Sequence, residues 1–198
     1  MRPCPGPTSS KPGRQHWPPG SVEILIWINV PDCRKTRVEL RPLKKAPREG
    51  KDMTKLVLVP VDGSAHARQA IEFAVDWARN HDAKLHLLHV PDLPSASELA
   101  FVDRYSIDVS KTTQRLEMIG QDIVAEAMDM VRAKDFTAVE GSVSIGNPAQ
   151  QITDKAKDLK ADLIVMGSRG MGDFKSLLVG SVSHKVMQHA PCTCVVVR

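Results

Sequence analysis

The chain has 198 residues, of which 42% are hydrophobic, 4% aromatic and 25% charged, with a net charge of +4. This length suits one domain with a core of aliphatic side chains, and no apolar run approaches the roughly 20 residues of a membrane-spanning helix. Four cysteines without regular spacing argue against a disulfide framework, so we expect a cytoplasmic protein that does not enter a membrane.

Residues 1–52 differ in composition from the rest of the chain. They hold 9 of the 14 prolines and a net charge of +6, whereas residues 53–198 carry −2. One patch from Val22 to Val30 could form a strand, but its flanks are rich in proline and a lone strand is not stable. We expect residues 1–52 to be a disordered or poorly folded, dispensable extension, and residues 53–198 to be the folded domain, beginning at Met53.

The basic extension leaves two interpretations open. Its Lys and Arg side chains can contact the phosphates of nucleic acid or of acidic membranes, or they can be solvated in a tail. The domain itself lacks the interleaved aromatic and basic residues on which bases stack. We therefore expect neither a nucleic acid nor a membrane as a partner.

From Met53 onward, strand patterns alternate with helix patterns. Apolar runs bounded by turn residues predict five strands, at 56–61, 84–90, 137–145, 163–166 and 194–197. The third of them is the most polar, which predicts a place near the edge of the sheet. Apolar residues at helical spacing predict four helices, and residues 91–110 are typical of a loop. Strict alternation predicts an α/β fold with a single open, doubly wound, five-stranded parallel sheet.

Two helix starts carry recognisable signals. Ser64 is a favourable N-cap residue for the first helix of the domain. Asn147 followed by Pro148 combines an N-cap residue with a proline at the first helical position.

A glycine-rich stretch follows the fourth predicted strand. It contains Gly167, Gly170 and, after nine further residues, Gly180 and Ser181, which precede the last predicted helix. Glycines let backbone N–H groups approach an anion without a Cβ in the way, and a helix N-terminus adds unpaired donors and partial positive charge. The pattern is typical of a phosphate-binding loop. An ordinary long loop that uses glycine for its turns is the alternative.

The spacing G-x2-G-x9-G-[ST] is similar to the nucleotide-binding signature of the universal stress protein family. The segments Leu163–Gly170, Ala190–Arg198 and Leu56–Ser64 also resemble the family, in the expected order, and the resemblance spans about residues 53–198. It implies strand order 3-2-1-4-5, which places a switch point between strands one and four. Ligands of open α/β sheets bind at such a point, beyond the carboxyl ends of the strands.

The end of strand one and the end of strand four therefore define a predicted site. Asp62, where strand one ends, could hold ribose hydroxyls or a divalent cation, Mg²⁺ or Mn²⁺, or could simply favour a helix N-terminus. The resemblance implies that Asp62 lies on the nucleoside side of the ligand. Arg169 could bind a phosphate as a charged fork or be a solvated loop residue. Three apolar residues complete the predicted cofactor site, either as walls against adenine or as core: Pro60, Val90 and Met166.

Other chemistries find less support in the sequence. The chain has neither a G-x4-G-K-[ST] motif nor a G-x-G-x-x-G motif after a strand. His184, His189, Cys192 and Cys194 could form a zinc site, but their spacing is poor for that purpose, and small buried thiols are the favoured interpretation. His86 and His89 should lie on opposite faces of their strand. We predict no catalytic residue and no Ser-His-Asp arrangement.

These observations predict an ATP-binding regulatory protein of the stress response rather than a dedicated enzyme. A slow metal-dependent ATPase or a nucleotide-dependent transferase is the first alternative, and a nucleotide-free interaction protein of the same fold is the second. The last strand, Cys194 to Arg198, is short, apolar and at the sheet edge in the implied order. Because an unprotected apolar edge is a template for pairing, we expect a homodimer through this strand, together with an unidentified regulatory protein partner. A monomer whose edge is covered, for example by the N-terminal extension, is the alternative.

Overall fold

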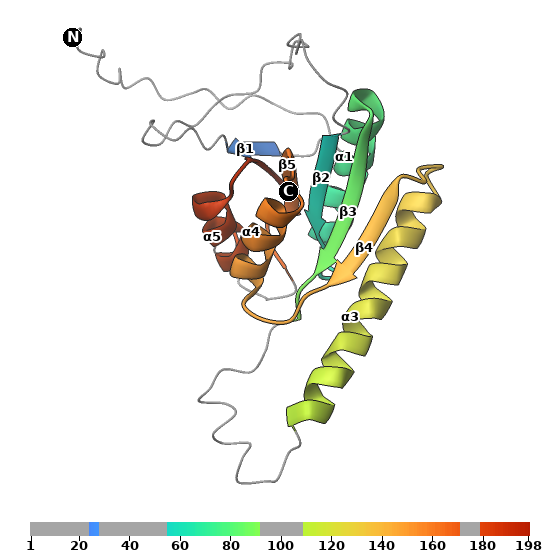
Figure 1. Ribbon diagram of the computed structural model, residues 1–198. Coiled ribbons are helices and arrows are strands. Elements are labelled where there is room, and N and C mark those ends of the chain that lie inside the picture. Colours follow the sequence, from blue (N-terminus) through green and yellow to red (C-terminus); the bar gives the residue numbers. More distant parts are fainter. Residues whose placement is uncertain (1–23, 28–54, 92–108, 171–178) are drawn as a thin grey trace, which may run out of the picture.

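The computed structural model describes residues 24–27, 55–91, 109–170 and 179–198, with side chains described from residue 55 onward apart from residues 109–110. A mixed sheet runs through the molecule in the order β1-β6-β5-β2-β3-β4 (Figure 1). Its strands are β1 (Ile24–Trp27), β2 (Lys55–Pro60), β3 (Ala83–His89), β4 (Val139–Val143), β5 (Leu163–Gly167) and β6 (Thr193–Val197). Strands β2 to β6 are parallel, which confirms the predicted order 3-2-1-4-5.

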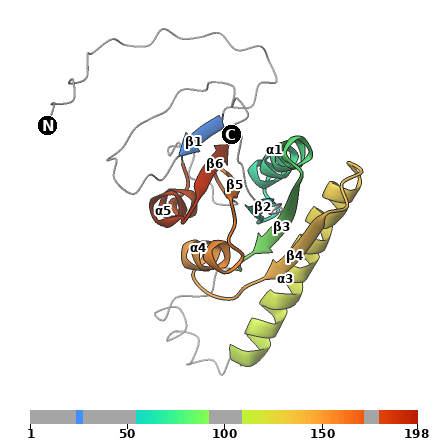
Figure 2. The same cartoon turned by 45° about the horizontal axis from the view of Figure 1, so that its top comes forward.

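Helices cover both faces of the sheet, as Figure 2 shows. The helices are α1 (Ala65–His81), α3 (Val109–Arg132), α4 (Pro148–Asp158) and α5 (Ser181–His189). Helices α1 and α3 pack on one face, and α4 and α5 pack on the other. Both predicted caps are confirmed, because Ser64 Oγ accepts from the Ala67 N–H at 3.1 Å and Asn147 Oδ1 accepts from the Gln150 N–H at 3.2 Å.

The core has two aliphatic layers, one on each face of the sheet. Along β2, Val57 and Val59 join the layer beneath α1 and α3, while Leu58 joins the layer beneath α4 and α5. All three side chains are fully buried. Since a strand covered on both faces must be apolar at every position, the continuous apolar run here is what places β2 in the centre of the sheet.

Four of the five predicted strands agree with the structure to within one residue at each end, and two predicted segments differ by more. Strand β4 is shorter than the predicted run 137–145, and its half-exposed residues fit its place at the edge of the sheet. Helix α3 begins at Val109, inside the predicted loop 91–110, of which residues 92–108 lie outside the described part. Among the described residues no helix is both long and apolar enough to cross a bilayer.

Strand β1 adds a sixth strand to the sheet from within the N-terminal extension. It runs antiparallel to β6, with Ile24 opposite Val197 and Trp27 opposite Cys194. The possible strand seen in the sequence therefore has a partner, which a local pattern could not reveal because the partner lies at the other end of the chain. The rest of the extension lies outside the described residues, and the boundary between extension and domain at residue 53 stays a prediction.

Candidate functional site

The loops that follow β2 and β5 meet at the carboxyl ends of these neighbouring parallel strands. A Cβ placed on Gly170 would lie 2.5 Å from Oδ2 of Asp62. The two residues are far apart in sequence, yet the carboxylate and the glycine loop adjoin directly. The topological switch point predicts ligand binding at this edge of the sheet, and the binding site itself stays a prediction.

The side chain of Asp62 is held in a defined orientation. Its Oδ1 accepts a hydrogen bond from the Ser64 N–H at 3.0 Å, in the turn that leads into α1. Gly63 between them has a φ of +79°, a left-handed conformation that glycine adopts without strain. The turn occupies one carboxylate oxygen and leaves the other, Oδ2, toward the glycine loop.

The three glycines of the motif have different structural roles. A Cβ on Gly167 would lie 2.8 Å from the carbonyl carbon of His66, so this glycine allows β5 and α1 to pack closely. Gly170 faces Asp62 instead. The N–H of Gly180 donates to the Ser168 carbonyl at 2.7 Å, which closes the loop on itself and leaves this N–H engaged within the protein.

The N-terminus of α5 opens beside the same loop. Gly180 is its N-cap and supplies no side-chain hydrogen bond. Within the described part of the chain, no acceptor faces the N–H groups of the three residues that follow, Ser181 to Ser183. Ser183 Oγ donates to the Gly167 carbonyl at 2.9 Å and ties the helix to the end of β5. Among the described residues, the start of this helix therefore has N–H donors without an acceptor, together with the partial positive charge of a helix N-terminus.

Two buried polar atoms of the loop have no hydrogen-bond partner among the described residues. They are Oγ of Ser168, a residue with no exposed surface, and Nε of Arg169. A buried polar group left unpaired costs about 1–3 kcal/mol. The sequence predicts a site residue at Arg169, whereas Ser168 is not among the predicted site residues. The signal for Ser168 in the sequence is its hydroxyl side chain between two glycines of the motif, Gly167 and Gly170.

The predicted apolar residues have distinct environments. Met166 is 3% exposed and belongs to the core beneath α4 and α5. Val90 and Pro60 are half-buried at the ends of β3 and β2, and Val90 packs against the same core layer. Met166 thus supports the site from beneath, whereas Pro60 and Val90 have surface left for a ligand.

His89 is a contributor that sequence reasoning missed. It is buried, and its Nδ1 lies 2.7 Å from the Val61 carbonyl oxygen. Since a carbonyl only accepts, Nδ1 carries the proton. The bond fixes the residue before Asp62 against the end of β3. A contact to a backbone carbonyl leaves no pattern in the sequence.

His86 lies on the opposite face of β3, as predicted. Its Nε2 is 2.8 Å from Ser142 Oγ, and its Nδ1 is 4.0 Å from a carboxylate oxygen of Glu140. The Glu140 side chain is 80% exposed, and 4.0 Å exceeds a hydrogen-bond distance. His86, Ser142 and Glu140 therefore lack the oriented carboxylate of a hydrolase triad.

The environment of His86 predicts acid sensitivity. Burial lowers the pKa of His86 below its ordinary value of 6.5, and Lys155 lowers it further, while Glu140 opposes the shift. As the pH is lowered below 6.5, His86 binds a proton more readily in the unfolded chain than in the folded chain, so the free energy of unfolding decreases. We expect His86→Gln to reduce the loss of unfolding free energy between about pH 7.5 and pH 5.5, as measured by urea unfolding at the two pH values. His184→Gln, at an exposed position, is the control. An equal loss in the parent and in His86→Gln would contradict the prediction.

The two thiols near the C-terminus lie in a poorly solvated environment. Burial, with Asp162 nearby, raises the pKa of Cys192 to about 11, and burial with Cys192 nearby raises that of Cys194 to about 12. Both thiols are therefore less acidic than an exposed cysteine and less reactive as nucleophiles. In the described ranges, no group of three or more His, Cys, Asp or Glu side chains could hold a metal ion. The zinc alternative gains no support.

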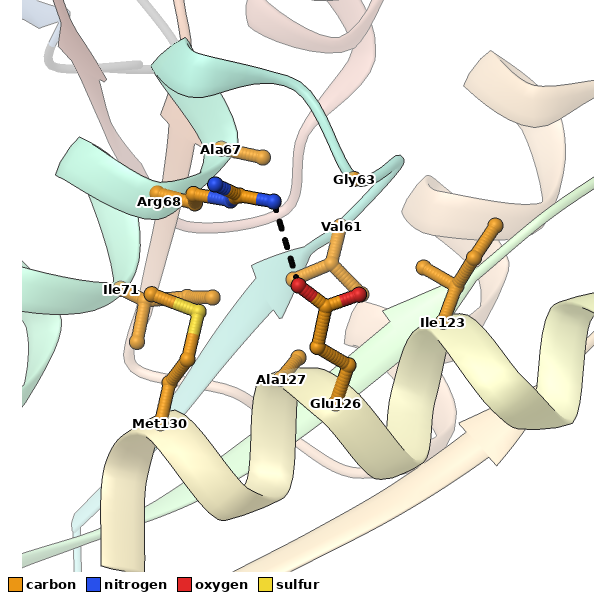
Figure 3. Close-up of a pocket in the computed structure, with 9 residues that line it drawn as sticks. All are labelled: Val61, Gly63, Ala67, Arg68, Ile71, Ile123, Glu126, Ala127 and Met130. Atoms are coloured by element: carbon orange, nitrogen blue, oxygen red, sulfur yellow. Dashed lines mark hydrogen bonds and ion pairs between the residues drawn. The ribbon is translucent and has the colours of Figure 1, made fainter. Parts of the chain in front are cut away.

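A separate shallow crevice lies between α1 and α3, on the other face of the sheet from Pro60 and Val90. Figure 3 shows Arg68 and Glu126 facing each other across it, joined by an ion pair of 3.1 Å. Both side chains are more than half exposed, so the pair contributes little stability. The crevice shares the β2–α1 turn with the predicted site but contains neither the glycine loop nor the start of α5: it is lined by Val61, Gly63, Ala67, Arg68, Ile71, Ile123, Glu126, Ala127 and Met130.

The chain is similar to known proteins both in sequence and in structure. The sequence model of the universal stress protein family matches residues 53–198. Universal stress protein YxiE of Bacillus subtilis is 34% identical over 147 residues, which cover 72% of this chain and 97% of that protein. UspA of Lactobacillus plantarum has a similar structure, with 28% identity, a TM-score of 0.54 and coverage of 75% of this chain and 100% of that one. A universal stress protein described in complex with cAMP is 25% identical, with a TM-score of 0.55 and coverage of 73% and 97%.

Proposed function

The chain belongs to the universal stress protein family, and we propose that it is a regulatory protein that binds ATP where β2 and β5 end. Family membership gives the general role, a part in the stress response. The binding site proposed here comprises Asp62, the loop from Gly167 to Gly170, and the start of α5.

One observation carries the proposal. Within the described ranges, the hydroxyl of Ser168 and Nε of Arg169 have no hydrogen-bond partner, and they lie in the loop beside the N-terminus of α5. The loop and the start of α5 adjoin, because the Gly180 N–H donates to the Ser168 carbonyl and a Cβ on Gly180 would lie 3.6 Å from Cα of Arg169. A phosphate group supplies acceptors for donors of this kind, and charge-assisted bonds are among the stronger hydrogen bonds of proteins.

The remaining residues divide the site into a phosphate end and a nucleoside end. Gly170 and Gly180 leave room along the loop because they lack a Cβ. Pro60 and Val90 offer half-buried apolar surface at neighbouring strand ends. The free oxygen of Asp62 suits a ribose hydroxyl or a divalent cation, Mg²⁺ or Mn²⁺, which would neutralise phosphate charge when bound.

A protein of similar structure also supports adenine nucleotides as the ligand class. The universal stress protein described with cAMP is 25% identical to this chain, and an adenine nucleotide bound there supports adenine nucleotides as the class to test here. Competition between ATP and cAMP for the stripped protein would rank the two, and tighter binding of cAMP would replace ATP in the proposal.

Binding without fast turnover is the expected behaviour. The described carboxylate beside Gly170 is Asp62, which we assign to a ribose hydroxyl or a cation rather than to activating water, so we favour the regulatory role over an ATPase or transferase. Phosphate release in the presence of Mg²⁺ measures the difference. A rate near that of a median enzyme, on the order of 10 s⁻¹, would contradict the regulatory role.

Asp62 provides a test of the nucleoside end. We expect Asp62→Ala to weaken ATP binding by about 10-fold with Mg²⁺ present and by less than about 3-fold with a chelator, because a cation bridge is lost only in the first case. Asp62→Asn is the matched control, since an amide oxygen can still accept from the Ser64 N–H and keep the turn. Calorimetric titration of both variants measures the effect, and equal losses with and without Mg²⁺ would exclude a cation at Asp62.

Assembly is a separate part of the proposal. The apolar character of β6 supports pairing of two copies through this strand, with a regulatory protein as a further partner. Val196 is fully buried, so a lysine at that position would test folding rather than assembly. A second copy can pair with β6 only when the outer edge of β6 is free of β1.

A further inference from the structure

Strand β6 is apolar on both of its faces. Cys194 and Val196 lie in the core layer beneath α4 and α5, and Val195 and Val197 lie in the layer beneath α1 and α3. One of its edges pairs with β5. Without β1, the other edge would carry unpaired N–H and C=O groups along an apolar strand, which is a template for pairing with another chain.

Strand β1 occupies that edge in the structure. Each of its four residues lies opposite one residue of β6, from Ile24 with Val197 to Trp27 with Cys194. Figure 1 shows β1 beside the C-terminal end of the chain. An edge can form one ladder at a time, because each of its N–H and C=O groups serves one neighbouring strand.

We propose that β1 is an internal cap that keeps the chain monomeric, and that its release exposes β6 for antiparallel pairing with β6 of a second copy. A two-fold axis between two copies brings the same edge of each together in antiparallel orientation. The second copy would therefore use the groups that β1 uses, and the two states exclude each other.

The position of β1 suits a cap that can be released. It is the outermost strand of the sheet and has four residues, whereas β5 and β6 pair over five. A short outermost strand opens at lower free energy than strands held between two neighbours. The extension that carries β1 would then control assembly without changing the parallel sheet.

The test uses the full-length chain and two prolines. Adjacent residues of an edge strand direct their N–H groups to opposite sides, so Leu25→Pro with Ile26→Pro removes an N–H that faces β6, whichever residue supplies it. Glu39→Pro with Leu40→Pro is the matched control, with two prolines added to the extension outside β1. Sedimentation velocity between about 1 and 100 μM measures assembly, and hydrogen exchange measures protection of the β6 amides.

The expected result is a monomeric parent and a monomeric control, both with protected β6 amides. The double-proline variant at β1 should show twice the parent mass at high concentration, a mass that falls on dilution. An excess of a synthetic peptide of residues 21–31 should bind the open edge of β6. This variant should then form a complex of one chain with the peptide instead of a dimer.

Two results would overturn the proposal. A dimeric parent would show that β1 does not prevent pairing, and a β1 variant that stays monomeric with exchanging β6 amides would show that the open edge does not pair. Leu25→Gly with Ile26→Gly weakens the strand while keeping every N–H, and it replaces the proline variant if that chain fails to fold. Neither readout involves ATP, so a failure here leaves the nucleotide proposal unaffected.

Discussion

Replacing Gly170 with valine is expected to abolish ATP binding while the chain still folds. The new Cβ would lie 2.5 Å from Oδ2 of Asp62, so the carboxylate and the loop must move apart at the point where they meet. Gly170 itself is exposed, and the core has no need to adjust. If the displaced loop loses two charge-assisted hydrogen bonds to the phosphates, the affinity for ATP falls at least about 100-fold.

The same result is expected for Gly180→Val, for a different reason. Its Cβ would lie 3.4 Å from the Ser168 carbonyl oxygen, which the protein can accommodate, but the side chain would stand at the start of α5 where phosphate must approach. Calorimetric titration with ATP, together with circular dichroism to verify folding, measures both variants.

The crevice between α1 and α3 supplies the control. Arg68→Ala with Glu126→Ala removes the ion pair across that crevice and should leave ATP affinity unchanged. If both glycine variants bound ATP like the parent, the glycine loop would not be the phosphate site. If the Arg68 and Glu126 variant lost binding instead, the site would lie on the other face of the sheet.

Gly167→Ala is expected to produce the largest loss of stability among the motif glycines. A Cβ there would lie 2.8 Å from the backbone carbonyl carbon of His66, and backbone inside a helix cannot rotate away as a side chain can. Overpacking of this kind costs roughly 1–3 kcal/mol. The corresponding fall in melting temperature is roughly 2–4 °C for each kcal/mol.

Gly170→Ala is the matched control for this prediction. It introduces the same methyl group in the same loop, but the atom it meets belongs to the Asp62 side chain. Thermal melts of the two variants in the absence of nucleotide should separate a glycine needed for packing from one needed for binding. Equal melting temperatures would contradict this division of roles.

The parallel sheet followed from strict alternation of strand and helix patterns, whereas the order of its strands followed from the family resemblance alone. The helix caps at Ser64 and Asn147 were predictable because capping depends on residues close in sequence. Strand β1 was not predictable, because its stability depends on β6 at the far end of the chain. The start of α3 at Val109 was missed because no apolar periodicity marks its first turns.

The candidate site was predictable in position but less so in detail. Glycine spacing located the loop, yet it could not distinguish Gly167, which packs against His66, from Gly170, which faces Asp62. The buried hydroxyl of Ser168 and the bond from His89 to Val61 depend on burial and on backbone carbonyls. Such contacts are fixed by the folded structure and leave no residue pattern.

Equilibrium dialysis of ATP against the nucleotide-stripped full-length chain, with Mg²⁺ present, decides whether the chain binds ATP. We expect saturable binding of one ATP per chain, reduced at least about 100-fold by Gly170→Val. Absence of saturable binding up to about 1 mM ATP, with the chain folded, would contradict it.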